Sequence, residues 1–143
     1  MAEAYLRQLG GDEFDVESAG FKPTRINPLV VEVMREEGVD LTGKPTQSAF
    51  ELFKRGKVFT YVITVCDDAV EAQCPIFPGM THRMHLPFPD PATVTGDHAE
   101  QLRQVREIRD RIKAVVTEFV DWVRGGETHR LGKLWDLRDI EKR

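Results

Sequence analysis

The stretch that decides the fold comprises Tyr61-Val-Ile-Thr-Val-Cys66, Cys74-Pro-Ile-Phe-Pro78 and Pro87-Phe-Pro-Asp90-Pro91. The apolar, β-branched run over 58–65 predicts a strand covered on both faces, which is typical of parallel sheets with helices on either side. The acidic and small residues, prolines and glycine over 67–80 predict a long loop. The order is therefore a strand, a loop with two cysteines, and then a carboxylate.

The rest of the chain alternates between helix and strand patterns. Helical spacing of apolar residues predicts helices over 1–9, 28–37, 48–54 and 97–123, and alternation predicts further strands over 14–19 and 82–88. We expect Phe50 and Phe53 to be buried by the third helix. This order predicts an α/β domain over 1–125 with an open, mostly parallel sheet in three layers, followed by a polar tail over 126–143.

Composition narrows the class of protein. A chain of 143 residues is long enough for one domain with a real core, and 41% hydrophobic with 31% charged residues is typical of a globular protein. A net charge of -4 disfavours nucleic acid as a partner. No apolar run approaches the ~18 residues of a membrane span. With no leader pattern at the N-terminus, we expect a cytoplasmic protein without a membrane partner.

Two cysteines and one aspartate are the candidate catalytic residues. Cys66 ends the predicted strand at the edge where open α/β sheets bind ligands, and Cys74 follows eight positions later. Such a pair can exchange a disulfide if both thiols are accessible, but free cysteines are also common packing residues. Asp90 precedes proline, which favours an extended backbone and a carboxylate held outside any helix. The alternative for Asp90 is a plain turn.

Taken together, these motifs resemble the thioredoxin-coupled arsenate reductases of the low-molecular-weight tyrosine phosphatase superfamily, from Met1 to roughly Arg124. The resemblance implies that a nucleophilic cysteine in a Cys-x5-Arg loop attacks arsenate, that Cys66 then attacks that sulfur, and that Cys74 resolves the disulfide for a thioredoxin-like reductant. It also implies that Asp90 protonates a leaving oxygen. The partners would be the reductant and an oxyanion, arsenate or phosphate.

Ser18 and Asn27 are the candidate binding residues. Ser18-Ala19-Gly20 and Asn27-Pro28 match the second strand and the second helix start of the family. Some of these reductases hold a structural potassium ion through positions that correspond to Glu3 and Ser18. Gln47 stands where the resemblance places an aspartate ligand, which argues against the ion here, so we expect no metal and no cofactor. Without a ligand, Ser18 is a turn residue and Asn27 a helix cap.

The Cys-x5-Arg loop itself has no counterpart in these 143 residues, because the sequence opens just past its expected place. We therefore expect the chain to be inactive as written, through a downstream gene start (for instance after a selenocysteine codon), a shortened chain, or a non-catalytic relative. The missing strand would lie between 14–19 and 58–65. Its absence would leave open strand edges, from which we expect a homo-oligomer.

Three functions stay open at this stage. The two cysteines favour an arsenate reductase, whereas a tyrosine or small-molecule phosphatase would need Asp90 but neither Cys66 nor Cys74. The third possibility is a non-enzymatic binding or regulatory module on the same scaffold. His82 and His85 should lie on opposite faces of a strand, where they suit neither a shared metal nor a triad. The charged run over 103–111 mixes arginines with acids, which predicts a solvated helix face.

Overall fold

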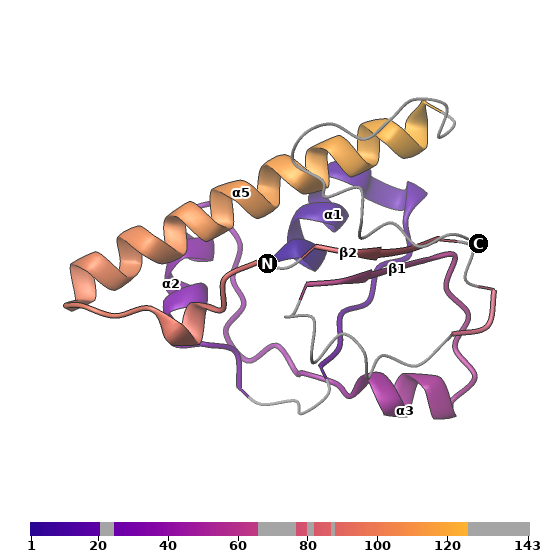
Figure 1. Cartoon of the computed structure of the whole chain (residues 1–143), viewed down its shortest axis with the longest axis horizontal. Helices are drawn as coiled ribbons and strands as arrows, with labels where there is room; N and C mark the ends of the chain where they lie inside the picture. The colour runs from indigo at the N-terminus through magenta and orange to yellow at the C-terminus, as the bar shows by residue number, and fades with distance from the viewer. Residues whose placement is uncertain (21–24, 66–76, 80–81, 87, 126–143) are drawn as a thin grey trace. The chain divides into compact units, whose positions relative to one another are not determined.

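The computed structural model of the chain describes residues 1–20, 25–65, 77–79, 82–86 and 88–125. It has a mixed α/β fold that divides into two compact units (Figure 1). The described residues of the first, the helical unit, are 1–18, 25–45 and 89–125. Those of the second, the strand unit, are 19–20, 46–65, 77–79, 82–86 and 88. The predicted tail over 126–143 lies outside the described residues.

The first helix of the helical unit, α1 (Ala2–Gly10), forms where the sequence predicts it. Gly11 follows with a φ of 57°, a left-handed conformation that glycine adopts at little cost because it has no Cβ. Tyr5 is completely buried, and its hydroxyl donates to Glu37 Oε1 at 3.2 Å. Burial raises the pKa of Tyr5 to about 12, and the Glu37 carboxylate adds to the rise.

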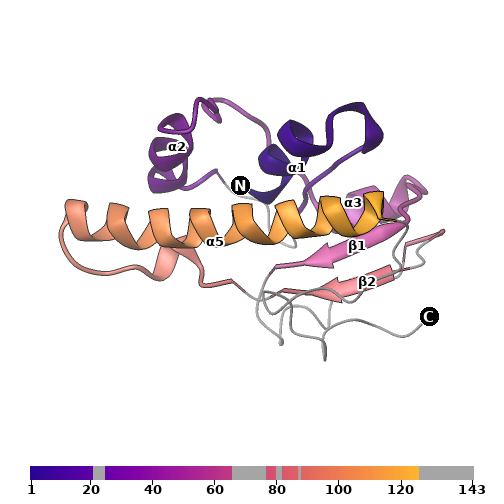
Figure 2. The same cartoon turned by 90° about the horizontal axis from the view of Figure 1, so that it is seen from above.

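Two further helices belong to the described residues of this unit. The second helix, α2 (Pro28–Arg35), begins as predicted, with Asn27 Oδ1 accepting the N–H of Leu29 at 2.8 Å. The long helix α5 (His98–Arg124) begins at its cap Asp97. In Figure 2, α2 lies beside the first half of α5 and α1 beside the second half, in keeping with the packing of both helices on α5. Short 3-10 turns, η1 (Gly11–Glu13) and η2 (Pro91–Thr93), complete the connections.

The apolar stripe predicted for α5 is buried in the structure. Its buried members are Leu102, Val105, Ile108, Ile112, Val115, Val116, Phe119 and Val120. Val123 has the same helical spacing as these residues but is half-buried, and its neighbour Trp122 is buried. A stripe of this length defines one helix face, which must pack on apolar surface.

The charged face of α5 is only partly solvated, so the prediction for 103–111 needs a correction. Arg103 is exposed and pairs within the helix with Glu100 and Glu107, as expected. Arg109, however, is 9% exposed, and its Nη1 donates to Val33 O at 2.9 Å and to Glu36 Oε1 at 2.8 Å. The cause is non-local, because the free carbonyls near the end of α2 need donors from elsewhere.

The strand unit contains a parallel pair, as predicted. Strand β1 (Tyr61–Thr64) pairs with β2 (His82–His85), in a register that sets Tyr61 opposite His82 and Thr64 opposite His85. The backbone bonds continue past the strands, with Leu86 N donating to Thr64 O at 2.7 Å. The fold therefore has the parallel pairing of an open α/β sheet.

The strand expected over 58–65 is shorter and less buried than predicted. Val58 is 66% exposed and Val65 is 45% exposed, while Tyr61, Val62 and Ile63 are half-buried. The prediction that this strand is covered on both faces is therefore wrong for β1, within the part of the chain that the structure describes. The reason is that β1 has β2 as its one strand neighbour there, and burial of a central strand requires neighbours and layers on all sides.

The strand expected over 14–19 is wrong as well. Among the described residues, this region shows pairing only next to its end, as an isolated parallel bridge between Gly20 and Ser48. There, Gly20 N donates to Gln47 O at 3.0 Å, and Ala49 N donates to Gly20 O at 2.9 Å. An alternating pattern shows which side chains share a face, but a strand forms only where a partner backbone is present.

The short helix α3 (Ala49–Lys54) forms within the predicted range, with Ser48 as its cap, but it buries a different face from the one expected. Phe50 and Phe53 are each 40% exposed, whereas Ala49 and Leu52 are buried. The expected burial of the two phenylalanines is therefore wrong. In the described parts of the chain, no helix combines the length and apolar character needed to cross a membrane.

Candidate functional site

The carboxyl ends of β1 and β2 form the best-defined edge of the strand unit. Leu86 N donates to Thr64 O at 2.7 Å, and Phe88 N donates to Val65 O at 3.3 Å, so β1 is held to the segment after β2 up to Val65. The next residue in the sequence is Cys66. The described part of β1 thus ends directly before the predicted two-cysteine loop, at the kind of edge where parallel sheets place functional groups.

A buried polar pair joins the two strands at this edge. Thr64 Oγ1 lies 2.7 Å from His85 Nδ1, and both residues are only 7% exposed. The Thr64 hydroxyl also lies 3.4 Å from Met84 O. Buried polar groups need such partners, and this pair connects the last residue of β1 to the last residue of β2. Sequence reasoning assigned Thr64 no role, although a threonine two positions before Cys66 was a visible signal.

The other histidine of β2 has a different environment. The ring of His82 lies against the ring of Tyr61, with centroids 5.0 Å apart, and His82 is also buried. His82 and His85 thus contact different residues of β1, so nothing described here brings them to a shared ligand. No group of three or more His, Cys, Asp or Glu side chains among the described residues could hold a metal ion.

The two predicted catalytic cysteines, Cys66 and Cys74, lie outside the described residues. Their assignment as a redox pair stays a prediction.

The predicted catalytic aspartate, Asp90, belongs to the helical unit and has the extended backbone that its proline neighbour predicts (φ -76°, ψ 122°). Its side chain is exposed, and Oδ1 accepts the N–H of Ala92 at 2.9 Å. Its backbone carbonyl accepts bonds from the N–H and hydroxyl of Thr93. These bonds make Asp90 the cap of η2 and hold its carboxylate outside a helix.

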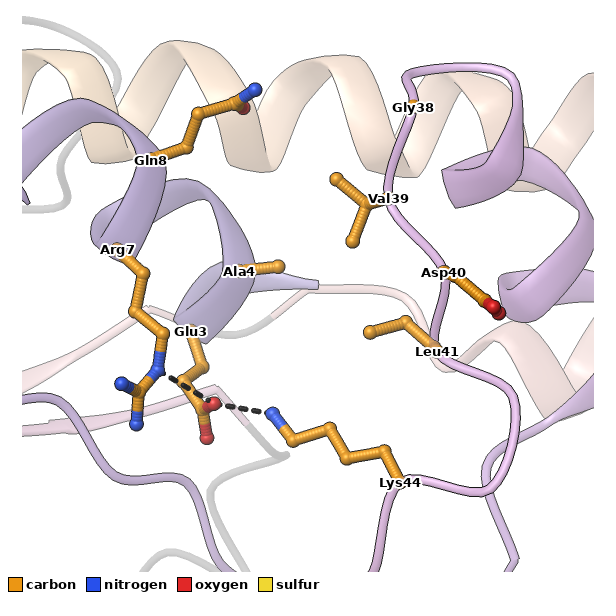
Figure 3. A pocket seen from close by; sticks show the side chains of 9 residues that line it. All are labelled: Glu3, Ala4, Arg7, Gln8, Gly38, Val39, Asp40, Leu41 and Lys44. Atoms are coloured by element: carbon orange, nitrogen blue, oxygen red, sulfur yellow. Dashed lines mark hydrogen bonds and ion pairs between the residues drawn. The ribbon is translucent and has the colours of Figure 1, made fainter.

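The predicted binding residue Ser18 contacts Glu3, the residue with which the resemblance groups it. Ser18 Oγ donates to Glu3 Oε1 at 2.6 Å, and Glu3 Oε2 accepts from Arg7 Nε at 3.1 Å and from Lys44 Nζ. Figure 3 shows Arg7 and Lys44 approaching the carboxylate from opposite sides. Burial by itself would raise the pKa of Glu3, but the bonds from Lys44, Ser18 and Arg7 outweigh it and lower that pKa to about 2.

These residues do not fit the potassium ion that the resemblance implies. One Glu3 oxygen already faces two cationic groups and the other accepts the Ser18 hydroxyl. A further cation at this carboxylate would be repelled by Lys44 and Arg7. The backbone carbonyl of Gln47, the residue at the expected aspartate position, accepts the Gly20 N–H in the other unit.

The other predicted binding residue, Asn27, acts as the cap of α2. Its Oδ1 bonds to Leu29 N, and Ser18 bonds to Glu3, so these two residues have different partners in the structure. Capping alone accounts for an asparagine at this position.

Comparison with known proteins identifies close similarity to one group of enzymes. The family profile described as low molecular weight phosphotyrosine protein phosphatase matches residues 1–128. The chain is 33% identical to an arsenate reductase of Halalkalibacterium halodurans over 122 residues, which covers 85% of each protein. It is 32% identical to an arsenate reductase of Bacillus subtilis with the same coverage, and 36% identical to one of Bacillus cereus over 79% of this chain and 81% of the relative.

Solved structures show the same fold. An arsenate reductase in the oxidized state matches with a TM-score of 0.68 at 20% identity, over 85% of this chain and 86% of that one. An arsenate reductase in the reduced state matches with a TM-score of 0.64 at 21% identity and the same coverage.

Proposed function

Because the chain belongs to the low molecular weight phosphotyrosine protein phosphatase family, we propose that it is an arsenate reductase-type member in which Cys66 and Cys74 form the redox-active pair. The observation that carries this proposal is the similarity to curated arsenate reductases over most of the chain. The strand pairing that ends at Val65, directly before Cys66, supports it further.

The proposed chemistry moves two electrons from thiols to arsenic. The thiolate of a nucleophilic cysteine first attacks arsenate, forming a sulfur–arsenic bond while an arsenic–oxygen bond breaks and the oxygen leaves as water after protonation. The Cys66 thiolate then attacks that sulfur, a disulfide forms, and the electron pair of the broken bond stays on arsenic, which leaves as arsenite. The Cys74 thiolate next attacks Cys66 and releases the first cysteine. A dithiol reductant of the thioredoxin type finally reduces the Cys66–Cys74 disulfide, and the two thiols of the reductant become a disulfide.

The 143-residue chain supplies only the later steps of this sequence. A Cys-x5-Arg motif needs arginine six positions after cysteine, but Ala72 and Met80 stand there after Cys66 and Cys74. We therefore propose that this chain neither reduces arsenate nor hydrolyses phosphate esters by itself. Turnover of arsenate with thioredoxin, clearly above that of a Cys66→Ser/Cys74→Ser variant, would contradict this proposal.

The redox pair has a direct test. Mild oxidation of the purified chain should form an intramolecular Cys66–Cys74 disulfide, and a thioredoxin with its reductase should reduce that disulfide faster than a small-molecule thiol does. Peptide mass mapping before and after reduction measures this. The Cys74→Ser variant is the control and should form no such bond. Two free thiols in the oxidised chain would refute the redox pair. Since this chemistry requires a reducing compartment, we also propose a cytoplasmic location.

A phosphatase is the second candidate, because the matching family profile describes phosphotyrosine phosphatases and Asp90 has the extended, exposed placement of an acid. This activity would depend on Asp90 and be indifferent to Cys74. If a version of the protein that carries a Cys-x5-Arg loop is assayed, Asp90→Asn should reduce aryl phosphate hydrolysis far more than Cys74→Ser. If Cys74→Ser instead reduces the rate of arsenate reduction far more than Asp90→Asn does, the result favours the reductase.

We further propose that the chain is a homo-oligomer that uses β1. Support comes from Val58 and Val65, which are exposed apolar residues at either end of a strand with one strand neighbour among the described residues. Strand edges and apolar side chains of this kind favour association. Light scattering should give a mass at least twice that of one chain. A stable monomer at high concentration would contradict this proposal.

A further inference from the structure

Three separate segments of the helical unit converge on one carboxylate, that of Glu3 in the first turn of α1. Arg7 comes from the next turn of the same helix, Ser18 from the segment after η1, and Lys44 from the segment after α2. The side chain of Glu3 is only 9% exposed, while that of Arg7 is 57% exposed and that of Lys44 is 33% exposed. Glu3 is thus the least exposed of these three charged side chains, and both cations approach it from more exposed positions.

A half-buried carboxylate is stabilised by positive charge beside it. Removing the partner of a buried ion leaves an uncompensated charge, which is strongly destabilising. Arg7 lies four residues away on the same helix, and its Nη2 also donates to Val16 O at 2.5 Å, so its link reaches only the nearby segment after η1. Lys44 is the cation that connects α1 to a distant segment, 41 residues further along the chain.

We propose that the Lys44 ammonium is a built-in cation that makes this cluster independent of ions in the medium. An ammonium group is a compact point charge with a flexible stem, which can take the place of a small hydrated cation beside oxygen ligands. Removal of its charge should leave Glu3 and Ser18 as oxygen ligands beside a solvent-open depression that Ala4, Val39 and Leu41 also line. Hard monovalent cations favour such oxygens.

The cluster itself defines which groups would bind the added ion. Figure 3 shows the aliphatic stem of Lys44 crossing toward Glu3, while the carboxylate of Asp40, which lines the same depression, is directed away from Glu3. Asp40 Oδ1 instead accepts the N–H of Thr42 at 2.9 Å. The carboxylate that binds the added cation should therefore be that of Glu3.

The test compares thermal unfolding in potassium, sodium and choline chloride at one ionic strength. The unchanged chain should melt at the same temperature in all three salts. Lys44→Ala should melt about 3–6 °C lower in choline chloride and regain most of that loss in potassium or sodium chloride, since a ligand that binds only the folded state stabilises it. Choline is too large to replace the ammonium group.

Matched variants separate a cation site from a general charge effect. Lys54→Ala removes an exposed lysine that pairs with Glu51 at 3.7 Å, and it should show no salt preference. Lys44→Arg should behave like the unchanged chain because the charge stays. Adding Glu3→Gln to Lys44→Ala should abolish the response to potassium. If Lys44→Ala does not fold in any salt, Lys44→Met, which keeps the aliphatic stem, takes its place.

Two outcomes would overturn the proposal. The first is an equal loss for the Lys44 variants in all three salts, or no loss at all, which would show that no cation replaces the ammonium group. The second is a melting temperature of the unchanged chain that depends on potassium, which would show that the Lys44 ammonium does not take the position of a cation beside Glu3. The cation response does not depend on either cysteine, so it is independent of the proposed reductase activity.

Discussion

The helical unit and the strand unit bury their apolar residues in different ways. In α5, eight predicted stripe residues are buried along a helix of 27 residues. In the strand unit, α3 has six residues and buries a face other than the expected one, and β1 leaves Val58 and Val65 exposed. A long helix makes its own backbone bonds and repeats its apolar face many times, whereas a short helix or a strand depends on what packs against it.

The largest expected effect tests whether α3 has a real core face. Leu52→Ala should lower the free energy of unfolding by about 2–4 kcal/mol, because Leu52 is 3% exposed and its loss leaves a cavity. Phe53→Ala should cost less than ~1 kcal/mol, since Phe53 is 40% exposed and its ring centroid lies 6.0 Å from that of Phe77. Urea unfolding followed by circular dichroism measures both. Equal losses would mean that the two faces are buried alike.

The next effect concerns the helical unit and the bond between α2 and α5. Arg109→Ala should lower the free energy of unfolding by about 2–3 kcal/mol, because it removes charge-assisted bonds to Val33 O and Glu36. Arg103→Ala, on the exposed face of the same helix, should cost less than ~1 kcal/mol. The same urea experiment measures the difference. A larger loss for Arg103 would show that the exposed face dominates.

A smaller effect is expected at the polar pair of the strand unit. Thr64→Val keeps the shape of the side chain but removes the hydroxyl 2.7 Å from His85 Nδ1, at a cost of about 1 kcal/mol. Thr117→Val, whose hydroxyl bonds to Lys113 O on the exposed side of α5, should cost less than ~0.5 kcal/mol. Thr64→Ser should stay close to the unchanged protein. Stability equal to the unchanged chain for Thr64→Val would mean that the pair does not join the strands.

The smallest expected effect is a dependence on pH. The hydrogen bond from Arg106 lowers the pKa of Glu36 from 4.5 to about 2, and a bond from Arg109 adds to this. Since the folded pKa lies below the ordinary one, this stabilisation is present above pH 4.5 and is lost as the pH falls toward 2. The urea midpoint should therefore fall less on acidification in Glu36→Gln than in the unchanged protein.

Glu51→Gln is the control for that measurement, because Glu51 is exposed and lies 3.7 Å from Lys54. On acidification, the urea midpoint of Glu51→Gln should fall as much as that of the unchanged chain. Identical acid profiles for the Glu36 variant and the unchanged chain would show that this carboxylate does not contribute to acid sensitivity.

Local sequence signals sufficed for the elements that carry their own determinants. Asn27-Pro28 marks the start of α2, Gly11 marks the end of α1, and the repeated apolar spacing marks the buried face of α5. Each signal acts within one or two turns, so no distant residue is needed to interpret it. The same holds for Asp90, whose extended backbone follows from its proline neighbour.

The tertiary structure decided the features that join distant parts of the chain. The Thr64–His85 pair, the burial of Arg109 and the bond from Lys44 to Glu3 connect residues 21, 76 and 41 positions apart. The face of α3 and the length of β1 depend in the same way on neighbours outside those segments. Hydrogen bonds and burial are set by distance in space, and a periodic pattern in sequence shows which side of an element faces inward but not which group it meets there.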